Sequence, residues 1–467
     1  MSRNVYVELD YFSGKKSTRI FSIKPDPSND AEGRLMRPLK FSIKVRTWIQ
    51  NESTTSGISK IIINNADGAL DDFANETFTE CRIKQAVDGV FTTLATAQVD
   101  RVIINGLKFI EVNLKDARSL LEIPLQDDFF PASETSDVGL GMNTYYALEG
   151  QPRPLTIGRA YSVRPVLAKR SNNEYHVHDS KADDIREVYD NGIVVSKNEH
   201  TKGFTLSVDP AGLIVADVNG AEIVGGTAVA WRLWEAIQWV FDKRGITNYL
   251  LSDLTDIYAD KARLIGYYQD NSTNISVREL IKRICDSFTG WFYADESGNI
   301  RFGYLDEPKV VADKSINKNN VIDGIKVFDD LAPNITTKIG SDRNWYVYDV
   351  DQIAAGATDQ NRTNLSQQWR AVLDGTGVLD EFYTSTEQVY DSILIDPPRA
   401  QLEINAITSL YSQRRKFYTF QSTLDAEIGE TVQLTHPRFS LDAGVNLLCV
   451  GREIDFIDNT YRLTLWG

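Results

Sequence analysis

Alternation of apolar and polar residues is the main pattern in the first third of the chain. Val5, Val7 and Leu9 alternate with polar residues, and residues 58–63 form a β-branched run. Successive side chains of a β-strand point to opposite faces of the sheet, so a period of two predicts half-buried strands. We therefore predict a β-domain over residues 1–150, which ends in a loop-like stretch rich in Pro, Gly, Ser, Thr and Asp.

Two Asn-Gly pairs predict tight hairpins. Asn105-Gly106 and Asn191-Gly192 each stand between two apolar runs. A type I′ turn needs a positive φ at both central residues, and Asn-Gly adopts that conformation readily. The second pair lies within another β-rich segment, which we predict to be a separate domain over residues 151–225.

The hydrophobic period becomes helical after Gly225-Gly226. Thr227 is a predicted N-cap, and Lys243-Arg244 followed by Gly245 predict the C-terminal end of the helix. The apolar positions between these signals recur at helical spacing: Ala230, Leu233, Trp234, Ile237, Val240 and Phe241. This segment predicts an amphipathic helix.

A second helix and a hairpin complete the middle of the chain. Ser276 and Glu279 form a capping box, whose side chains satisfy exposed backbone N–H groups at the start of a helix that runs to about Gly290. Residues 291–294 and 300–304 then predict two strands joined by a polar turn. We assign residues 226–320 to an α/β domain with two amphipathic helices.

Strand patterns return in the last part of the chain, which we assign to a further β-domain over residues 321–467. A helix over 399–411 follows Pro397-Pro398, and the polar region 358–386 fits no single element. The predicted strands are 325–328, 335–339, 345–350, 418–424, 431–434, 447–454 and 461–466. The predicted fold class is therefore multi-domain and mainly β with an α/β insertion.

Composition excludes several classes of protein. The chain has 467 residues, and 50 Lys+Arg against 65 Asp+Glu give a formal charge of −15. Specific nucleic-acid binding is not expected, because phosphate neutralisation needs clustered Lys and Arg. Cys81, Cys285 and Cys449 are too far apart for a CxxC-type metal site, and we expect Cys285 and Cys449 to be packed as small apolar residues. No membrane span and no signal peptide are predicted, and synthesis in a reducing cytoplasm fits the cysteine usage.

The strongest candidate for metal chemistry is a pair of histidines. On a strand, His176 and His178 would face one side, with Asp179 next to them, whereas His200 and His436 are distant in sequence. Two ligands without a carboxylate motif are a weak signal, and residues 64–72 lack the acidic positions of a calcium loop. We therefore predict no catalytic, cofactor-binding or metal-binding residue.

Several stretches together resemble the tail-tip or baseplate hub proteins of tailed bacteriophages and related prophage-type particles. They follow one another in order over most of the chain, and each consists of strand and turn sequence rather than a catalytic motif. The stretches are Gly57–Asp71, Gly150–Pro165, Tyr175–Asp179, Val188–Gly192, Arg343–Trp345, Gly429–Phe439 and Leu463–Gly467.

The resemblance implies a non-enzymatic structural protein of the virion, located in the tail baseplate or tip. It implies a homotrimer in which β-barrel-like hub domains form a ring that continues the tail tube, with the other domains, among them the central helix-pair and hairpin domain, packed outside or below the ring. The expected partners are other copies of the chain, distal tail and tail tube proteins, the tape measure protein, and tail fibre or tip proteins. Part of the −15 charge would face the lumen and keep DNA from adhering during ejection.

Two other classes of function remain open at this stage. A receptor- or carbohydrate-binding tail protein would present aromatic residues in exposed loops, for which Phe129-Phe130 and Tyr145-Tyr146 are candidates. A hydrolase that degrades cell wall would need an acid–base pair, and no such pair can be nominated among the scattered carboxylates.

Overall fold

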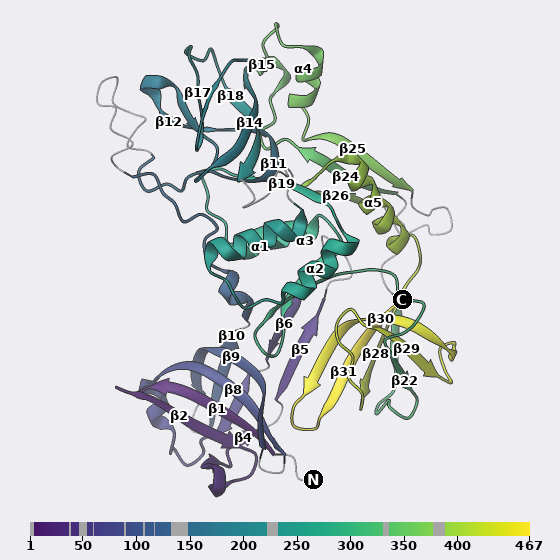
Figure 1. Ribbon diagram of the computed structural model, residues 1–467. Coiled ribbons are helices and arrows are strands. Elements are labelled where there is room, and N and C mark those ends of the chain that lie inside the picture. The colour runs from purple at the N-terminus through teal and green to yellow at the C-terminus, as the bar shows by residue number, and fades with distance from the viewer. Residues whose placement is uncertain are drawn as a thin grey trace.

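The computed structural model describes most of the chain and shows a mainly β architecture with a helical centre (Figure 1). Two curved sheets occupy one half of the molecule, a β-rich domain lies at the other end, and the helices α1, α2 and α3 lie between them. The described residues are 4–36, 39–45, 54–58, 60–87, 90–105, 108–115, 117–131, 148–221, 232–329, 336–376 and 388–467.

The N-terminal sheet has the order β3-β2-β1-β8-β9-β10-β7-β4. Val7 and Leu9 are buried as the alternation predicts, but Glu8 and Asp10 on the other face of β1 are buried as well. Arg82 donates to both carboxylates, at 3.0 Å to Glu8 and 2.8 Å to Asp10. The strands are β1 (Asn4–Phe12), β2 (Lys16–Ser22), β3 (Ala31–Glu32), β4 (Leu35–Met36), β7 (Ile61–Asn64), β8 (Thr77–Val87), β9 (Val90–Asn105) and β10 (Phe109–Lys115).

The strands on either side of both Asn-Gly pairs are paired as predicted. Asp190 pairs with Ile193, and positive φ at Asn191 (46°) and Gly192 (83°) matches the predicted two-residue turn. Asn105 pairs with Phe109, which leaves three residues between the strands instead of two. Gly106 and Leu107 lie outside the described residues, so the predicted turn at Asn105-Gly106 stays a prediction.

The second β-rich part holds two sheets. One has the order β15-β14-β18-β11-β19-β27 and the other the order β12-β13-β17-β16. Their strands are β11 (Leu155–Val163), β12 (Val166–Lys169), β13 (Glu174–His176), β14 (Ala182–Asp190), β15 (Ile193–Val194), β16 (Asn198–His200), β17 (Gly203–Thr205), β18 (Ile214–Ala221), β19 (Leu264–Gln269) and β27 (Leu394–Ile395).

The predicted helices form, and the middle of the chain holds one further helix. α1 (Leu233–Arg244) ends at Gly245 with φ +66° as expected, although the predicted N-cap Thr227 lies outside the described residues. α3 (Val277–Asp286) is capped by Ser276, whose hydroxyl accepts from the backbone N–H of Glu279 at 3.2 Å. The additional helix α2 (Leu251–Asp260) packs against the hairpin β20 (Gly290–Ala294) and β21 (Ile300–Tyr304). Within the described ranges, no helix is long and apolar enough to span a bilayer.

A small sheet of order β25-β24-β26 lies beside α5. The predicted strand over 345–350 is wrong, because the N–H groups of Trp345 and Tyr346 bond to the carbonyls of Tyr161 and Ser162 and no regular ladder forms. The ambiguous region 358–386 contains a helix and a strand. The elements are β24 (Thr336–Arg343), α4 (Asp359–Leu365), β25 (Trp369–Thr376), β26 (Gln388–Tyr390) and α5 (Pro397–Tyr411).

The C-terminal sheet includes a strand from the other end of the chain. Its order is β22-β29-β30-β31-β28-β23, and β5 pairs antiparallel with β30, with Lys44 opposite Gly451 and Lys40 opposite Asp455. The strands are β5 (Lys40–Lys44), β6 (Thr55–Ile58), β22 (Lys314–Asn317), β23 (Lys326–Asp329), β28 (Lys416–Ser422), β29 (Thr431–His436), β30 (Leu441–Asp455) and β31 (Thr460–Trp466).

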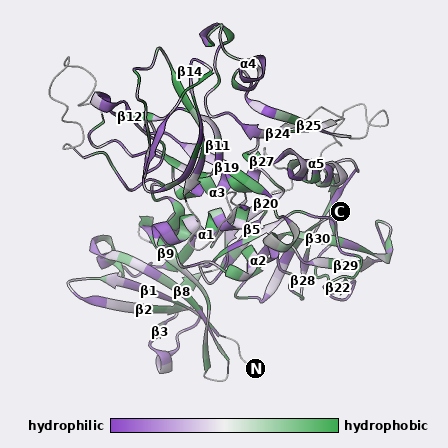
Figure 2. Ribbon diagram, turned by 45° about the horizontal axis from the view of Figure 1, so that its top comes forward, coloured by the Kyte–Doolittle hydropathy of each residue, from purple (hydrophilic) through white to green (hydrophobic). Residues whose placement is uncertain are grey.

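Buried apolar side chains connect these parts. One cluster runs from Val7 in the N-terminal sheet through Phe241 in α1 and Leu280 in α3 to Trp466 in the C-terminal sheet. Figure 2 shows apolar residues gathered around α1, α3 and β20 at the centre of the molecule. The helical centre therefore acts as a shared core on which the sheets pack.

We predict that Phe41→Ala destabilises the C-terminal sheet. Phe41 of β5 is 3% exposed, so removing its ring leaves a cavity that costs about 3 to 5 kcal/mol of unfolding free energy. Equilibrium denaturation followed by circular dichroism measures the loss. Ser42→Ala is the matched control, because Ser42 lies on the exposed face of the same strand. An equal loss in both variants would contradict a structural role for β5.

Candidate functional site

Strand pairing brings two histidines together that are far apart in the sequence. His176 at the end of β13 and His200 at the end of β16 both lie opposite Gly203 of β17. A Cβ atom at Gly203 would lie 2.1 Å from the carbonyl oxygen of Tyr175, so only glycine permits this close approach of strands. The ring centroids of His176 and His200 are 5.6 Å apart.

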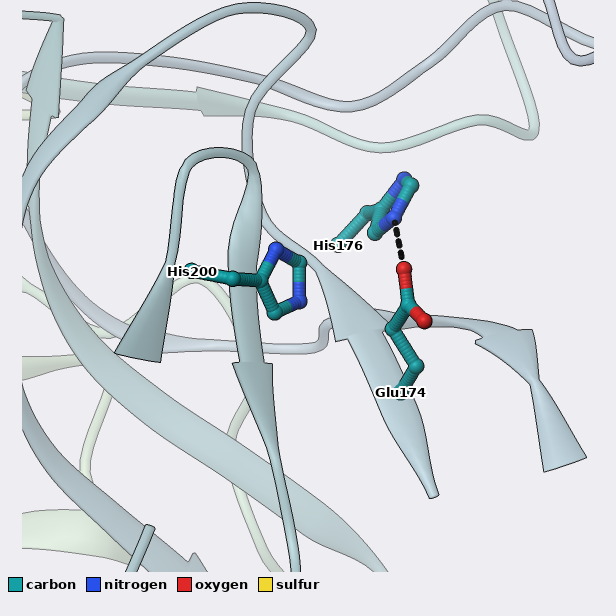
Figure 3. A group of neighbouring side chains, drawn as sticks. All are labelled: Glu174, His176 and His200. Carbon is teal, nitrogen blue, oxygen red and sulfur yellow. Dashed lines mark hydrogen bonds and ion pairs between the residues drawn. The ribbon is translucent and has the colours of Figure 1, made fainter. Parts of the chain in front are cut away.

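Glu174 completes a cluster of possible ligands with these histidines (Figure 3). One donor atom from each of the three residues lies within 4.8 Å of the others. In Figure 3, the His176 ring points toward the Glu174 carboxylate, to which it is hydrogen-bonded. The sequence analysis did not identify Glu174 or His200 as possible ligands beside His176. The sequence signal for them was that both lie on a segment predicted to be β-rich.

Arg153 determines the proton arrangement of His176. Its Nη1 donates to His176 Nδ1 at 3.0 Å, so the neutral imidazole carries its proton on Nε2 and donates to Glu174 Oε1 at 3.1 Å. The Arg153 guanidinium also lies 4.5 Å from the centroid of the Phe130 ring, which stacks on the His176 ring. Both nitrogens of the His176 ring are therefore already committed.

The same arginine anchors the segment that links the N-terminal sheet to the next β-rich part. We call residues 124–131 and 148–153 the linker. Arg153 Nε forms an ion pair with Asp128 at 3.1 Å, and the backbone N–H of Arg153 donates to the Asp128 carbonyl at 2.9 Å. The side chain of Gln126 donates to the carbonyl of Asp270 at 3.1 Å. The histidine cluster thus holds the linker against the sheet that contains β13.

Burial makes the cluster sensitive to protonation. Removal from water is the largest effect and lowers the pKa of His176 from 6.5 to about 4, the hydrogen bond to Glu174 opposes this shift, and the positive charge of Arg153 adds to it. A second positive charge on His176 would face the Arg153 guanidinium. The neutral histidine is therefore the form that the folded cluster accepts.

His178 does not share the face of His176, so the expectation that the two side chains would face one side of a strand is wrong. β13 ends at His176, and the fully buried His178 ring lies beside Trp239 of α1 with its centroid 6.4 Å away. Burial raises the pKa of Asp179, but the hydrogen bond of His178 and the ammonium of Lys243, 2.7 Å away, outweigh it and lower the pKa overall. Asp179 therefore ties α1 to the β-rich part as an ionised carboxylate.

A divalent cation does not suit the Glu174–His176–His200 cluster. A metal on His176 Nε2 would move the ring proton to Nδ1, where it would face the N–H of Arg153. The guanidinium adds electrostatic repulsion, and the backbone N–H of Lys202 already donates to His200 Nδ1 at 3.3 Å. The geometry supports a hydrogen-bonded joint and not a metal centre.

Other sequence candidates serve structural roles. The Asn64–Asp72 stretch forms a turn, in which Asp67 pairs with Arg34 at 2.7 Å, as expected of a strand-closing turn. Cys285 and Cys449 are buried as predicted, Cys81 is buried too, and burial raises the pKa of Cys449 to about 12. These thiols are packed rather than reactive.

The aromatic residues that were candidates for glycan contact differ in their exposure. Phe130 is 2% exposed under Arg153, so its expected place on an exposed surface is wrong, whereas Phe129 is 45% exposed. Tyr145-Tyr146 lies outside the described residues. Phe130 packs against Arg153 and His176 at the linker. Phe129 and Phe130 therefore cannot form an exposed aromatic surface together.

We predict that protonation of His176 weakens the fold between pH 6.5 and 4. The unfolded chain binds this proton more tightly, because the folded-state pKa is the lower one, so stability is full above pH 6.5 and falls by roughly 3 kcal/mol as pH falls to 4. Denaturant midpoints across this pH range measure the slope. His176→Gln should flatten the slope, and His436→Gln in β29 should leave it unchanged. A wild-type chain with no pH dependence in this window would contradict the assignment.

We also predict that zinc does not stabilise the protein. Both ring nitrogens of His176 are engaged and Arg153 repels a cation, so an excess of zinc chloride should leave the thermal midpoint unchanged. Differential scanning calorimetry with and without zinc makes the comparison, with magnesium chloride as the control. A rise in the thermal midpoint with zinc but not with magnesium would contradict the prediction and show that zinc displaces Arg153 from His176.

Comparison with known proteins gives similarities in overall structure. No protein-family model and no curated protein sequence matches the chain. Among solved structures, the 43 kDa tail protein of prophage MuSo2 from Shewanella oneidensis is similar at 9% identity and a TM-score of 0.43, over 99% of this chain and 96% of that one. The prophage tail protein gp18 from Listeria monocytogenes EGD-e gives 10% identity and a TM-score of 0.44, over 99% and 94%.

A chain of the virion of a native gene transfer agent particle is similar over 75% of this chain and 92% of its own length, at 11% identity and a TM-score of 0.43.

Proposed function

We propose that this protein is a structural component of a phage tail baseplate or tail tip, and that it forms a trimeric hub ring that continues the tail tube. In this proposal the ring encloses a lumen for DNA passage and connects the tube and distal tail proteins to fibre or tip proteins. The tape measure protein would end at the same ring. The protein would act through its interfaces, without catalysis.

The pairing of β5 with β30 carries this proposal. It makes the N-terminal part of the chain supply a strand to the C-terminal sheet, so the two end sheets form one connected body. A subunit of a ring must keep the surfaces that meet its two neighbours at a constant separation, because a heterologous interface closes only at one rotation angle. The continuous chain and the strand pairing join the two sheets, which supports a subunit of this kind.

The chemistry of the described residues supports a role without catalysis. His176 is held by Arg153 and Glu174, and His178 is fully buried beside Trp239. The cysteines are buried. The histidines serve the joint between domains, the cysteines are packed in the core, and in this proposal none of these side chains is offered to a substrate. We retain residues 1–150, 151–225, 226–320 and 321–467 as the proposed domains.

We predict that the purified chain assembles into a trimer with a central hole. Light scattering should give three times the 52.6 kDa of one chain, and negative-stain images should show a ring. The formal charge of −15 should place acidic groups along the lumen, which would keep DNA from adhering.

A chain that stays monomeric at every accessible concentration would contradict the ring, and a ring with a basic lumen would contradict the role of the charge. Binding of the monomer to host polysaccharide would then favour a receptor-binding tail protein. Clearing of peptidoglycan would favour a hydrolase.

A further inference from the structure

The outer part of the linker forms a paired arm, which we define as residues 128–131 and 148–152. The backbone N–H of Phe130 donates to the carbonyl of Gln151 at 2.9 Å, and the N–H of Gly150 donates to the carbonyl of Phe130 at 3.0 Å. These hydrogen bonds join the two segments of the arm to each other. The arm therefore keeps its own backbone pairing if it leaves the sheet on which it lies.

A small apolar cluster holds the arm on β12. Phe130 and Leu148 of the arm pack against Val166 and Ala168 of β12, in a cluster that is separate from the main core. Phe130 is 2% exposed and Ala168 is 5% exposed, so the arm shields this part of β12 from water. Segments that bury only a few apolar side chains open locally, without unfolding of the whole chain.

His176 of β13 lies against the arm and the residue that follows it. Its ring stacks on the Phe130 ring with the centroids 5.8 Å apart. Arg153, directly after the arm, donates from Nη1 to His176 Nδ1 at 3.0 Å, and its guanidinium lies 4.5 Å from the Phe130 centroid. Neutral His176 is therefore the acceptor for the arginine that closes the arm.

Protonation removes this acceptor. The imidazolium form carries a proton on each ring nitrogen, so Nδ1–H of His176 would face the N–H of Arg153. Arg153 is 2% exposed, and the two positive charges would meet away from water. Opening of the arm separates the charges and lets water hydrate the protonated ring.

The groups around this contact include both signs of charge. Glu174 accepts from His176 Nε2 at 3.1 Å and favours the charged ring. Burial outweighs this hydrogen bond, and Arg153 and the neighbouring His200 ring add to the effect of burial, so the pKa of His176 is about 4 while the arm is closed. The charged and titratable groups that face the contact come from the linker, β13 and the β16–β17 hairpin: Arg153, Asp128, Glu174, His200 and Lys202.

We propose that the arm is a pH-sensitive latch, which lies closed on β12 and β13 while His176 is neutral and opens when His176 is protonated. Opening exposes the apolar cluster around Phe130, while the main core stays folded. This inference goes beyond the proposed role in a phage tail, because it concerns a single chain and needs no partner.

Acidification favours the open arm. An exposed His176 has the ordinary pKa of 6.5, whereas the closed arm lowers the pKa to about 4. The closed arm is therefore fully stable above pH 6.5 and loses stability as the pH falls towards 4. These two values predict that the ratio of open to closed molecules rises about twentyfold between pH 7 and pH 5.

Thiol labelling of Ala168→Cys measures this opening. A thiol under the arm should react with dithiodipyridine only when the arm is open, because residue 168 is buried by the arm. Val208→Cys is the matched control, since Val208 is 76% exposed and reports the reactivity of an accessible thiol at each pH. We expect the ratio of the two labelling rates to rise about twentyfold between pH 7 and pH 5.

A second substitution tests the role of His176. In the Ala168→Cys chain, His176→Gln should abolish the rise, because the glutamine amide can accept from Arg153 and donate to Glu174 but does not titrate. Slow labelling of this variant at pH 7 would show that its arm still closes. His436→Gln in β29 is the matched control and should keep the full rise.

The native cysteines distinguish local opening from global unfolding. Cys81, Cys285 and Cys449 are buried, so they should stay unlabelled at pH 5 while the introduced thiol reacts, as mass spectrometry of the labelled peptides can show. Labelling of the native cysteines at the rate of the introduced thiol would overturn the latch. A constant ratio from pH 7 to pH 5, or an equal rise with His176→Gln, would also overturn it. Each of these results is independent of whether the chain forms a ring.

Discussion

Backbone pairing between β5 and β30 is the constraint on which the rest of this structure depends. It ties residues 40–44 to residues 451–455, so the two ends of the chain cannot separate without breaking a strand ladder. The helical centre fits into this arrangement, because α1 and α3 share one apolar cluster with both end sheets. Bringing together residues so far apart in the sequence has a high entropic cost of loop closure. This pairing therefore forms only when many other contacts stabilise the same fold. The chain is consequently one connected body rather than a string of independent domains.

The linker shows how the second β-rich part is attached to that body. Arg153 joins three interactions at one point: an ion pair with Asp128, a hydrogen bond to His176 and a contact with the Phe130 ring. Lys243 and Asp179 fasten α1 to the same region. Buried charged groups are costly unless every one is paired, so these contacts favour one orientation of the domains over others. The histidines therefore serve as parts of a joint, and their spacing in the sequence has no bearing on metal chemistry.

In the proposed structural role, the protein would act through its surfaces. Among the described residues, His176, His178 and the three cysteines are buried, whereas apolar side chains such as Val310 and Phe12 are exposed. A loop held by hydrogen bonds on both flanks presents Val310 without stabilising its side chain. That combination of a fixed backbone and exposed apolar side chains is what a preorganised interface requires, because little conformational freedom is lost when a partner binds.

The sequence by itself determined the elements that depend on near neighbours. Alternation identified the strands around Val7, the Asn191-Gly192 turn took its predicted form, and the Ser276 cap and Gly245 end marked the helices α3 and α1. Only the tertiary structure decided what depends on distant partners: the strand that β5 adds to the far sheet, the meeting of His176 with His200, and the burial of Phe130 under Arg153. The physical reason is that turns, caps and periodicity are set within a few residues, whereas strand pairing and buried ion pairs are set by the free energy of the assembled core.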